Sequence, residues 1–223
     1  EYLVGGKDIS NFPMQPYSDI ICNFLGDFSK ELSKDKDAKK FPDIQALAFW
    51  CRKNNMINFK KRFITKEIRL GLGLIFHITP SNIPTNFAYS LIFGLITGNS
   101  NIVKVPSKKF EQVKIICKVL NKLLKNDFKK LGKMISIVRY NDNDDFTKKL
   151  SEECNARIIW GGDKTISNIR KYPLKIRSFD INFADRYSLC AINSDQIIKF
   201  NENELKRLAE KFYNDTYVVD QNA

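Results

Sequence analysis

The chain has 223 residues, 43% of them apolar and 28% charged, and its 37 Lys and Arg against 25 Asp and Glu give a formal net charge of +12. This length and apolar content can bury a hydrophobic core, which excludes intrinsically disordered and fibrous repeat proteins. The five scattered cysteines and one histidine argue against a disulfide framework and a zinc site, and favour a reducing compartment. No apolar run reaches the roughly 20 residues of a membrane span, and the first residues do not resemble a signal peptide. We therefore expect a cytoplasmic protein with no membrane span.

The positive charge is spread along the whole chain and comes mostly from lysine. Such a distribution makes every solvent-exposed face similarly basic and marks out no single binding surface. Proteins that recognise DNA bases use arginine more than lysine, because arginine can form two hydrogen bonds to one base. The charge alone therefore does not favour nucleic-acid binding, which stays open as an alternative through a basic surface.

The first third of the sequence predicts two or three helices, one over 17–32 and one over 43–54. The charged stretch 33–40 between them is typical of a solvated loop. From residue 68 onward, β-rich runs alternate with helical patterns, which predicts βαβ units on a mostly parallel sheet. We expect strands over 68–79, 101–105, 134–139, 156–160 and 187–192.

Helical spacing of apolar residues predicts the connections between these strands. One helix has Pro84 at its first position and ends at Gly98 in a left-handed cap. Others have Phe110 and Asp142 near their starts, and a last helix covers 203–213. No internal repeat is present in the sequence.

The run 79–87, TPSNIPTNF, follows the first of these strands and leads directly into a helix. Ligands of open α/β sheets bind at such carboxyl ends of strands, where backbone N–H groups converge. Asn82 lies at the crest of the turn, where its amide could donate to a developing oxyanion. The alternative is that Asn82 only caps the helix or stabilises the turn.

Three further runs accompany this turn: TGNSNIVKVPSK at 97–108, WGGD at 160–163 and VDQNA at 219–223. Together they resemble the aldehyde dehydrogenase superfamily, in which Pro-x-Asn-x-Pro is followed by a helix, Gly-Asn and a Lys-Pro-Ser strand end. The forms TPSNIPTN and KVPSK are similar to the LuxC-type acyl-CoA reductases, the reductase component of the fatty-acid reductase complex of bioluminescence. The resemblance covers about 68–223, and any one of these motifs alone would be weak.

The resemblance implies an α/β fold with a mostly parallel Rossmann-type sheet flanked by helices, 1–67 being an N-terminal helical segment packed on a nucleotide-binding domain over 68–223. It implies that Asn82 is catalytic, as an oxyanion-hole donor. It further implies cofactor-binding residues at Thr79, Pro80, Ser81, Lys104, Ser107, Lys108, Gly161 and Gly162.

Lys104 matches the family lysine that contacts the adenosine ribose or its 2′-phosphate, although it could also be one more surface lysine. NAD-preferring relatives place a glutamate shortly after this lysine, whereas this chain has Ser107 and Lys108. A hydroxyl and a cation suit a phosphate better than a diol, which favours NADP over NAD. Gly161 and Gly162 lack Cβ atoms and would let the dinucleotide approach, or they form an ordinary tight turn.

Two departures from the superfamily pattern matter. Asn182 stands where hydrolytic relatives have a general-base glutamate, and without that base hydrolysis of a thioester slows by roughly 10²–10⁴-fold. The catalytic cysteine would follow Ala223, and each of the five cysteines in the chain is interpreted as a small buried hydrophobe. We therefore expect the chain to be the N-terminal, cofactor-binding portion of a longer protein.

The expected reaction is NADPH-dependent reduction of a fatty acyl-CoA to an aldehyde through a cysteine thioester. The expected partners are an acyl-CoA or acyl-protein thioester, an acyl-protein synthetase and further copies of the chain. The alternative is a non-catalytic binding or assembly module on the same scaffold.

Overall fold

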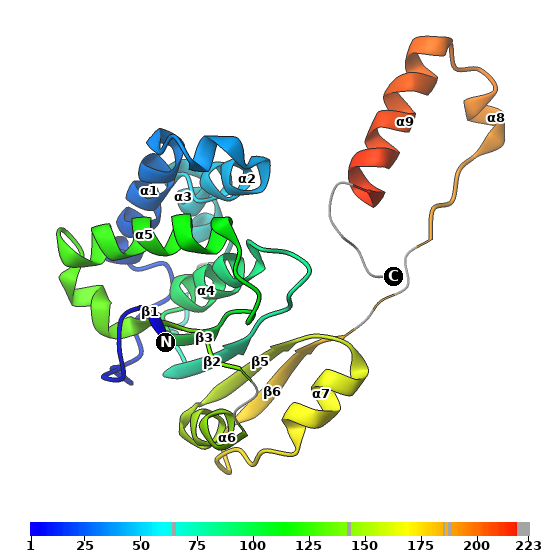
Figure 1. Ribbon diagram of the computed structural model, residues 1–223. Coiled ribbons are helices and arrows are strands. Elements are labelled where there is room, and N and C mark those ends of the chain that lie inside the picture. The colour runs from blue at the N-terminus through cyan, green and yellow to red at the C-terminus, as the bar shows by residue number, and fades with distance from the viewer. Residues whose placement is uncertain (64–65, 142–143, 185, 187–188, 218–223) are drawn as a thin grey trace. The chain divides into compact units, whose positions relative to one another are not determined.

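A computed structural model describes residues 1–63, 66–141, 144–184, 186 and 189–217 (Figure 1). The chain divides into two compact units, 1–184 and 185–223. Among the described residues, no helix combines the length and apolar character that crossing a bilayer requires. The boundary expected between 67 and 68 stays a prediction.

The first unit is built on a six-stranded sheet with the order β1-β4-β3-β2-β5-β6. Its strands are β1 Tyr2–Val4, β2 Leu74–Ile78, β3 Ser100–Lys104, β4 Ile135–Val138, β5 Ala156–Trp160 and β6 Phe179–Phe183. All neighbours pair in parallel except β1, which is antiparallel to β4 at one edge. The expected α/β class with a mostly parallel sheet is confirmed.

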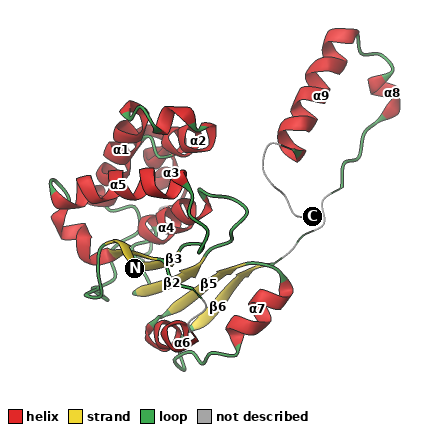
Figure 2. Cartoon of the chain, in the orientation of Figure 1, coloured by secondary structure: helices red, strands yellow, loops and turns green. Residues whose placement is uncertain are grey.

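Seven α-helices accompany this sheet among the described residues: α1 Asp19–Lys34, α2 Pro42–Trp50, α3 Lys53–Phe63, α4 Asn86–Ile96, α5 Glu111–Lys125, α6 Asp144–Glu153 and α7 Asp163–Arg170. Short 3₁₀ helices, η1 and η2, cover Ala38–Lys40 and Lys129–Met134. Helices α4 and α5 lie on one face of the sheet with α1–α3 beyond them, and α6 and α7 lie on the other (Figures 1 and 2).

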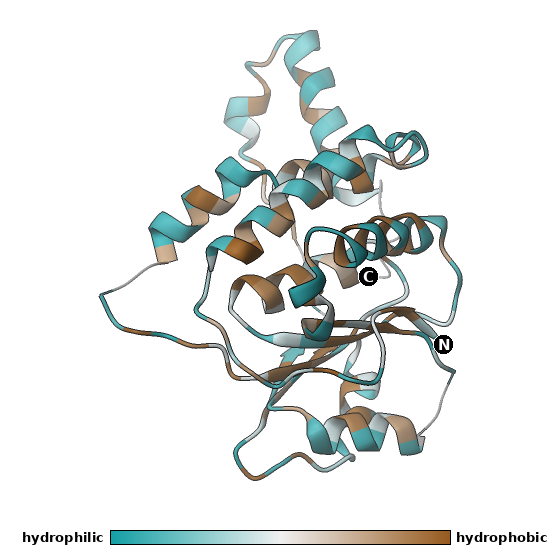
Figure 3. Cartoon of the chain, turned by 90° about the vertical axis from the view of Figure 1, so that its left-hand side faces the viewer, coloured by the Kyte–Doolittle hydropathy of each residue, from teal (hydrophilic) through white to brown (hydrophobic). Residues whose placement is uncertain are grey.

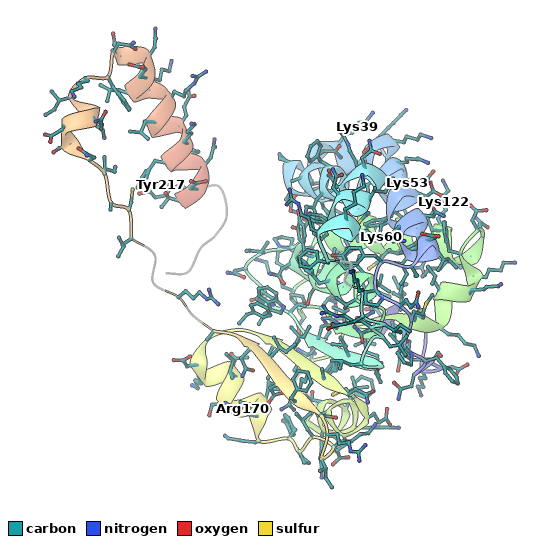
Figure 4. The ribbon with its side chains drawn as sticks, turned by 180° about the vertical axis from the view of Figure 1, so that it is seen from behind. Lys39, Lys53, Lys60, Lys122, Arg170 and Tyr217 are labelled. Atoms are coloured by element: carbon teal, nitrogen blue, oxygen red, sulfur yellow. The ribbon has the colours of Figure 1, made fainter. Side chains whose placement is uncertain are left out.

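Two hydrophobic cores lie between the sheet and the helices on its two faces. The larger one joins α1–α3 to α4, α5 and the sheet, and the smaller one joins the opposite face of the sheet to α6. The central strands β2 and β3 are almost wholly buried, although β2 contains His77 and β3 begins with Ser100 and Asn101. The hydropathy of the sheet and its helices is drawn in Figure 3. The lysines are spread over the outer helical faces, as Lys39, Lys53 and Lys122 illustrate (Figure 4).

The turn after α4 has the expected left-handed glycine. Gly98 has φ +84°, and a Cβ atom there would lie 2.1 Å from the carbonyl oxygen of Met14. Its N–H donates to the carbonyl of Leu95, and the next N–H, of Asn99, donates to the carbonyl of Gly94. These paired bonds form a Schellman motif, which closes the helix and directs the chain into β3.

Several local predictions were wrong. Pro84 lies in a turn, and α4 begins two residues later with Thr85 as its N-cap. The stretch 33–40 contains the end of α1 and η1 rather than only a loop, because the carboxylate of Asp35 accepts the N–H groups of Asp37 and Ala38. The last strand is β6 at Phe179–Phe183; of the expected 187–192, residues 187–188 lie outside the described part, and 189–192 form no strand.

The second unit contains α8 Ser194–Ile197 and α9 Glu202–Thr216. A capping box starts α9: the Asn201 side chain accepts the N–H of Glu204, and the Glu204 side chain accepts the N–H of Asn201. Neither helix has a buried residue.

Candidate functional site

The candidate functional edge of the sheet is where the strand order reverses. From β2 the chain proceeds outward through β3 to β4, then returns to the other side of β2 as β5 and continues to β6. The register pairs Ile78 with Lys104 on one side and with Ile159 on the other, so these strands end at the same edge. Open α/β sheets bind ligands at such a switch point. The loops after β2 and β5 therefore frame the candidate site.

The turn after β2 is tied to β3 by Thr79. Its hydroxyl donates to the carbonyl oxygen of Lys104 at 2.8 Å, and its N–H donates to the same oxygen at 3.3 Å. Thr79 is buried, Pro80 is half-buried and Ser81 is exposed. Thr79 thus holds the turn in place, and Ser81 faces solvent at the edge.

Asn82 is half-buried on this turn, and its Oδ1 atom is buried without a hydrogen-bond partner. The Oδ1 atom of Asn86, at the start of α4, is in the same condition. Turning a carboxamide by half a rotation exchanges its oxygen for an NH₂ donor in the same volume. A buried amide without a partner is costly, so this turn is suited to a ligand that supplies the partner.

Lys104 and Ser107, at the end of β3, meet around Tyr140. The Lys104 Nζ lies 5.0 Å from the centre of the Tyr140 ring, and the Ser107 hydroxyl donates to the Tyr140 carbonyl at 3.3 Å. Lys108 is exposed and turns instead to Phe110, with its Nζ 5.0 Å from that ring. The structure therefore brings two of these three predicted residues together.

Tyr140 is a residue that the sequence reasoning missed. It follows β4, and its hydroxyl lies 3.0 Å from that of Thr147 on α6, while its ring meets Phe146 edge-on at 4.9 Å. Burial raises the pKa of the Tyr140 phenol to about 12, so it stays neutral. The available signal was an aromatic residue directly after a predicted strand, but its nearness to Lys104 depends on the order of the strands.

Gly161 and Gly162 connect β5 to α7. The Gly161 N–H donates to the carbonyl of Phe183 at 3.2 Å, and a Cβ atom at Gly161 would lie 3.0 Å from Cγ2 of Thr165. Gly162 is the N-cap of α7 and supplies no side chain to that helix end. The first N–H groups of α7 are therefore left for water or an anionic ligand at this edge.

A family model described as acyl-CoA reductase (LuxC) matches residues 30–223. The chain belongs to the LuxC acyl-CoA reductase family. No curated protein sequence is significantly similar to it.

Solved structures of a proline utilization A and of two dehydrogenases resemble this LuxC-family chain in fold. A mutant proline utilization A (PutA) from Bradyrhizobium japonicum aligns with TM-score 0.58 and 14% identity over 75% of this chain and 20% of its own. A mutant 1-pyrroline-5-carboxylate dehydrogenase from Thermus thermophilus aligns with TM-score 0.52 and 14% identity, over 75% of this chain and 38% of its own. Lactaldehyde dehydrogenase from Escherichia coli aligns with TM-score 0.50 and 15% identity, over 74% of this chain and 37% of its own. The chain thus spans well under half the length of these structures, and the likeness concerns the fold.

The cysteines of the LuxC-family chain are mostly core residues. Cys22, Cys51, Cys117 and Cys154 are buried as expected, whereas Cys190 is exposed and the expectation of burial was wrong there. Burial raises the pKa of the Cys117 thiol to about 12 and that of Cys154 to about 11, and it also raises the pKa of Cys22 and Cys51. A nucleophilic cysteine needs a lowered pKa, so these four thiols are unsuited to the role.

Two features lie at the ends of β5 and β6. Asn182, the position of the missing glutamate, is exposed on β6. The neighbouring Trp160 and Phe183, at the ends of β5 and β6, stack with ring centres 3.9 Å apart and planes 7° apart. The sequence analysis did not predict this contact between Trp160 and Phe183, because the two rings meet only through the pairing of β5 with β6.

Proposed function

We propose that this chain supplies the cofactor-binding part of an NADP-dependent acyl-CoA reductase that forms an aldehyde. The observation that carries the proposal is the switch point between β2 and β5, where the Oδ1 atom of Asn82 is buried without a hydrogen-bond partner and Lys104 ends the next strand. The family match and the aldehyde dehydrogenase-like fold support a nicotinamide-dependent oxidoreductase.

The residues at this edge fit a phosphorylated dinucleotide. The ammonium group of Lys104 and the hydroxyl of Ser107 would receive the 2′-phosphate, and the exposed Lys108 lies one position further along the same loop. The uncapped start of α7 and the adjacent Gly161 would receive the pyrophosphate. Thr79, Pro80 and Ser81 would line the turn between them. When bound, the reduced cofactor supplies a hydride.

In the proposed reaction, the acyl group passes from CoA to a cysteine thiolate, and the CoA thiolate leaves and takes up a proton. The thioester carbonyl then accepts a hydride, and collapse of the tetrahedral oxyanion expels the cysteine thiolate and releases the aldehyde. Asn82 would donate its amide N–H to that oxyanion. Asn182 cannot act as a general base toward water, which protects the thioester from hydrolysis.

The nucleophile is proposed to come from residues outside this chain. Four of the five cysteines are buried with raised pKa values, and the fifth, Cys190, belongs to the second unit rather than to the unit that carries the candidate site. The chain also spans only 20–38% of the solved structures it resembles. The sequence of the parent gene after Ala223 is the first check, because a codon other than cysteine there would remove the expected nucleophile.

We also propose a substrate, a protein partner, an oligomeric state and a cellular location for the full-length enzyme. Its substrate would be an acyl-CoA or acyl-protein thioester, an acyl-protein synthetase would be its partner, and the full-length protein would form a homo-oligomer in the cytoplasm. Co-purification of the full-length protein with a synthetase, and its mass in solution, would test the last two points.

Titration of NADPH and NADH tests the cofactor assignment. We expect the chain to bind NADPH more tightly, and Lys104→Ala to weaken NADPH binding by about tenfold or more, the worth of one hydrogen bond to a charged group. NADH binding should change little. Lys39→Ala, which removes an exposed ammonium group from η1, is the matched control and should change neither affinity. Equal NADPH binding by the wild type and Lys104→Ala would reject the assignment.

A further inference from the structure

The parallel strands of the sheet begin at the edge opposite the candidate site (Figure 1), and Figure 3 shows the molecule from that side. Three segments of the chain lie along this edge, namely 10–16, 66–73 and 171–178. We call the surface that they form the amino edge. None of these segments contributes a residue to the candidate site.

Hydrogen bonds tie the three segments to the starts of the strands. The N–H of Met14 donates to the carbonyl of Gly98 at 2.8 Å, and the N–H of Gly71 donates to the carbonyl of Met14 at 3.0 Å. The Ser178 hydroxyl donates to the carbonyl of Cys154, just before β5, at 2.8 Å. Because β5 pairs with both β2 and β6, the segments that precede these strands are neighbours.

Large apolar side chains are exposed along the amino edge. Exposed apolar residues that are scattered singly are ordinary on a soluble protein, whereas a gathering of them marks an interaction surface. The exposed apolar residues of the amino edge, each 49–104% accessible, are Phe12, Ile68, Leu70, Leu72 and Ile176. This edge is therefore suited to a partner with an apolar layer.

Basic residues accompany these apolar side chains. Segments 66–73 and 171–178 contain five lysines and arginines but one glutamate, and segment 10–16 has no charged residue. The glutamate, Glu67, pairs with Arg69 at 3.0 Å, and both side chains are exposed. The amino edge as a whole is therefore positive, and its partner should combine negative charge with an apolar interior.

Ile176 combines both features at the tip of a tight turn. Its side chain is fully exposed, and Lys175 and Arg177 stand on either side of it in the sequence. The N–H of Ser178 donates to the carbonyl of Lys175 at 2.9 Å, and the Lys175 Nζ donates to the carbonyl of Glu153 at 2.6 Å. These bonds hold the turn in place, so it presents an apolar tip between two cationic residues.

We propose that the amino edge is a docking surface for a bilayer that contains anionic lipids. The apolar side chains would enter the boundary between headgroups and acyl chains, and the ammonium and guanidinium groups would bind lipid phosphates. A nucleic acid would leave the apolar side chains in water, so the combination favours a bilayer. The cytoplasmic leaflet of a cell membrane carries anionic lipids. The inference does not depend on the proposed function, because the candidate site is on the opposite edge.

Co-sedimentation with lipid vesicles tests this inference. Vesicles of phosphatidylcholine are compared with vesicles of an equimolar mixture of phosphatidylcholine and phosphatidylglycerol. The chain should bind the mixed vesicles much more tightly than the neutral ones, and high salt should release it. Ile176→Asp should weaken binding by about tenfold or more, because an isoleucine side chain no longer leaves water. Arg177→Glu should weaken it by about fivefold or more.

Ile198→Asp and Lys39→Glu are the matched controls. Ile198 is an exposed isoleucine of the second unit, and Lys39 is an exposed lysine on η1. They make the same chemical changes away from the amino edge and should leave binding nearly unchanged. Circular dichroism checks that each variant is folded.

Three results would overturn the proposal. The first is a folded chain that does not bind the mixed vesicles, and the second is binding that Ile176→Asp leaves unchanged or that the control variants weaken equally. The third is a dimer in analytical ultracentrifugation that Ile176→Asp dissociates, without vesicle binding by the wild type. In that case the amino edge would be a contact between copies of the chain.

Discussion

The guanidinium group of Arg157 on β5 donates to both carboxylate oxygens of Asp180 on β6, from Nε at 2.8 Å and from Nη2 at 3.1 Å. Arg157 is 1% exposed, and it also donates to the Ser151 hydroxyl on α6 and the Tyr172 carbonyl. This fork joins the last two strands to the helix beneath them. It therefore holds β6, and with it Phe183, in register at the edge that carries the candidate site.

Removing the carboxylate should destabilise the chain strongly. Asp180→Ala leaves the buried guanidinium without its counter-charge, and we expect a loss of about 3–5 kcal/mol in the free energy of unfolding. Arg170, which is exposed and lies 3.7 Å from the same carboxylate, provides the control. Arg170→Ala should cost less than about 1 kcal/mol. Urea unfolding measures both, and similar losses for the two variants would contradict the assigned role of Arg157.

Gly98→Ala should also destabilise the chain. The new side chain would require a left-handed backbone, with φ near +84°, and would meet the Met14 carbonyl. We expect a cost of about 2–4 kcal/mol. At Gly132 a Cβ atom meets nothing within 4 Å, so Gly132→Ala should stay within about 0.5 kcal/mol of the wild type. Thermal unfolding of the pair checks this, and an unchanged Gly98→Ala would show that the Schellman turn is not required.

Acid should weaken the fold through His77. Burial lowers the pKa of folded His77 to about 4 from the ordinary histidine value of 6.5, so the unfolded chain binds the proton more readily. The stability is complete above pH 6.5 and is lost as the pH falls toward 4, by about 3 kcal/mol in all. His77 is the one histidine of the chain. His77→Gln should flatten the slope of unfolding free energy between pH 6.5 and 5, whereas an unchanged slope would exclude His77 as its source.

Thiol labelling should distinguish one cysteine from the rest. In the folded chain an aromatic disulfide reagent should react rapidly with the exposed Cys190 and slowly with the four buried thiols, whose pKa values are raised. All five should react in denaturant. Cys190→Ser should abolish the rapid phase. Rapid reaction of a second thiol would contradict the assignment of the remaining cysteines to the core.

The alternation of strands and helices from β2 to β5 could be predicted because each of these strands contains a short run of β-branched residues between helical patterns. Strand β6, FDINF, was missed although its alternation of apolar residues with Asp180 and Asn182 is typical of a half-buried strand. Asp180 is tolerated there only because Arg157, distant in the sequence, neutralises it. The short edge strand β1 at Tyr2–Val4 carried too few residues for a pattern.

Some residues of the candidate site could likewise be predicted from the sequence, and others could not. Asn82, Lys104 and Gly161 each stand at the end of a recognisable strand, so their common edge could be inferred. Tyr140 and the Trp160–Ser90 bond depend on which strands become neighbours and on how α4 lies across them. Local sequence patterns carry no information about such contacts.

A crystal structure of the chain with NADP⁺ tests the central claim most directly. We predict density across the carboxyl ends of β3, β2 and β5, with the 2′-phosphate bound by Lys104 and Ser107 and the pyrophosphate at the start of α7. The claim would be contradicted by a dinucleotide bound elsewhere, for example in the hollow lined by Lys109, Lys114 and Arg139. It would also be contradicted by a folded chain that stays empty at saturating NADP⁺.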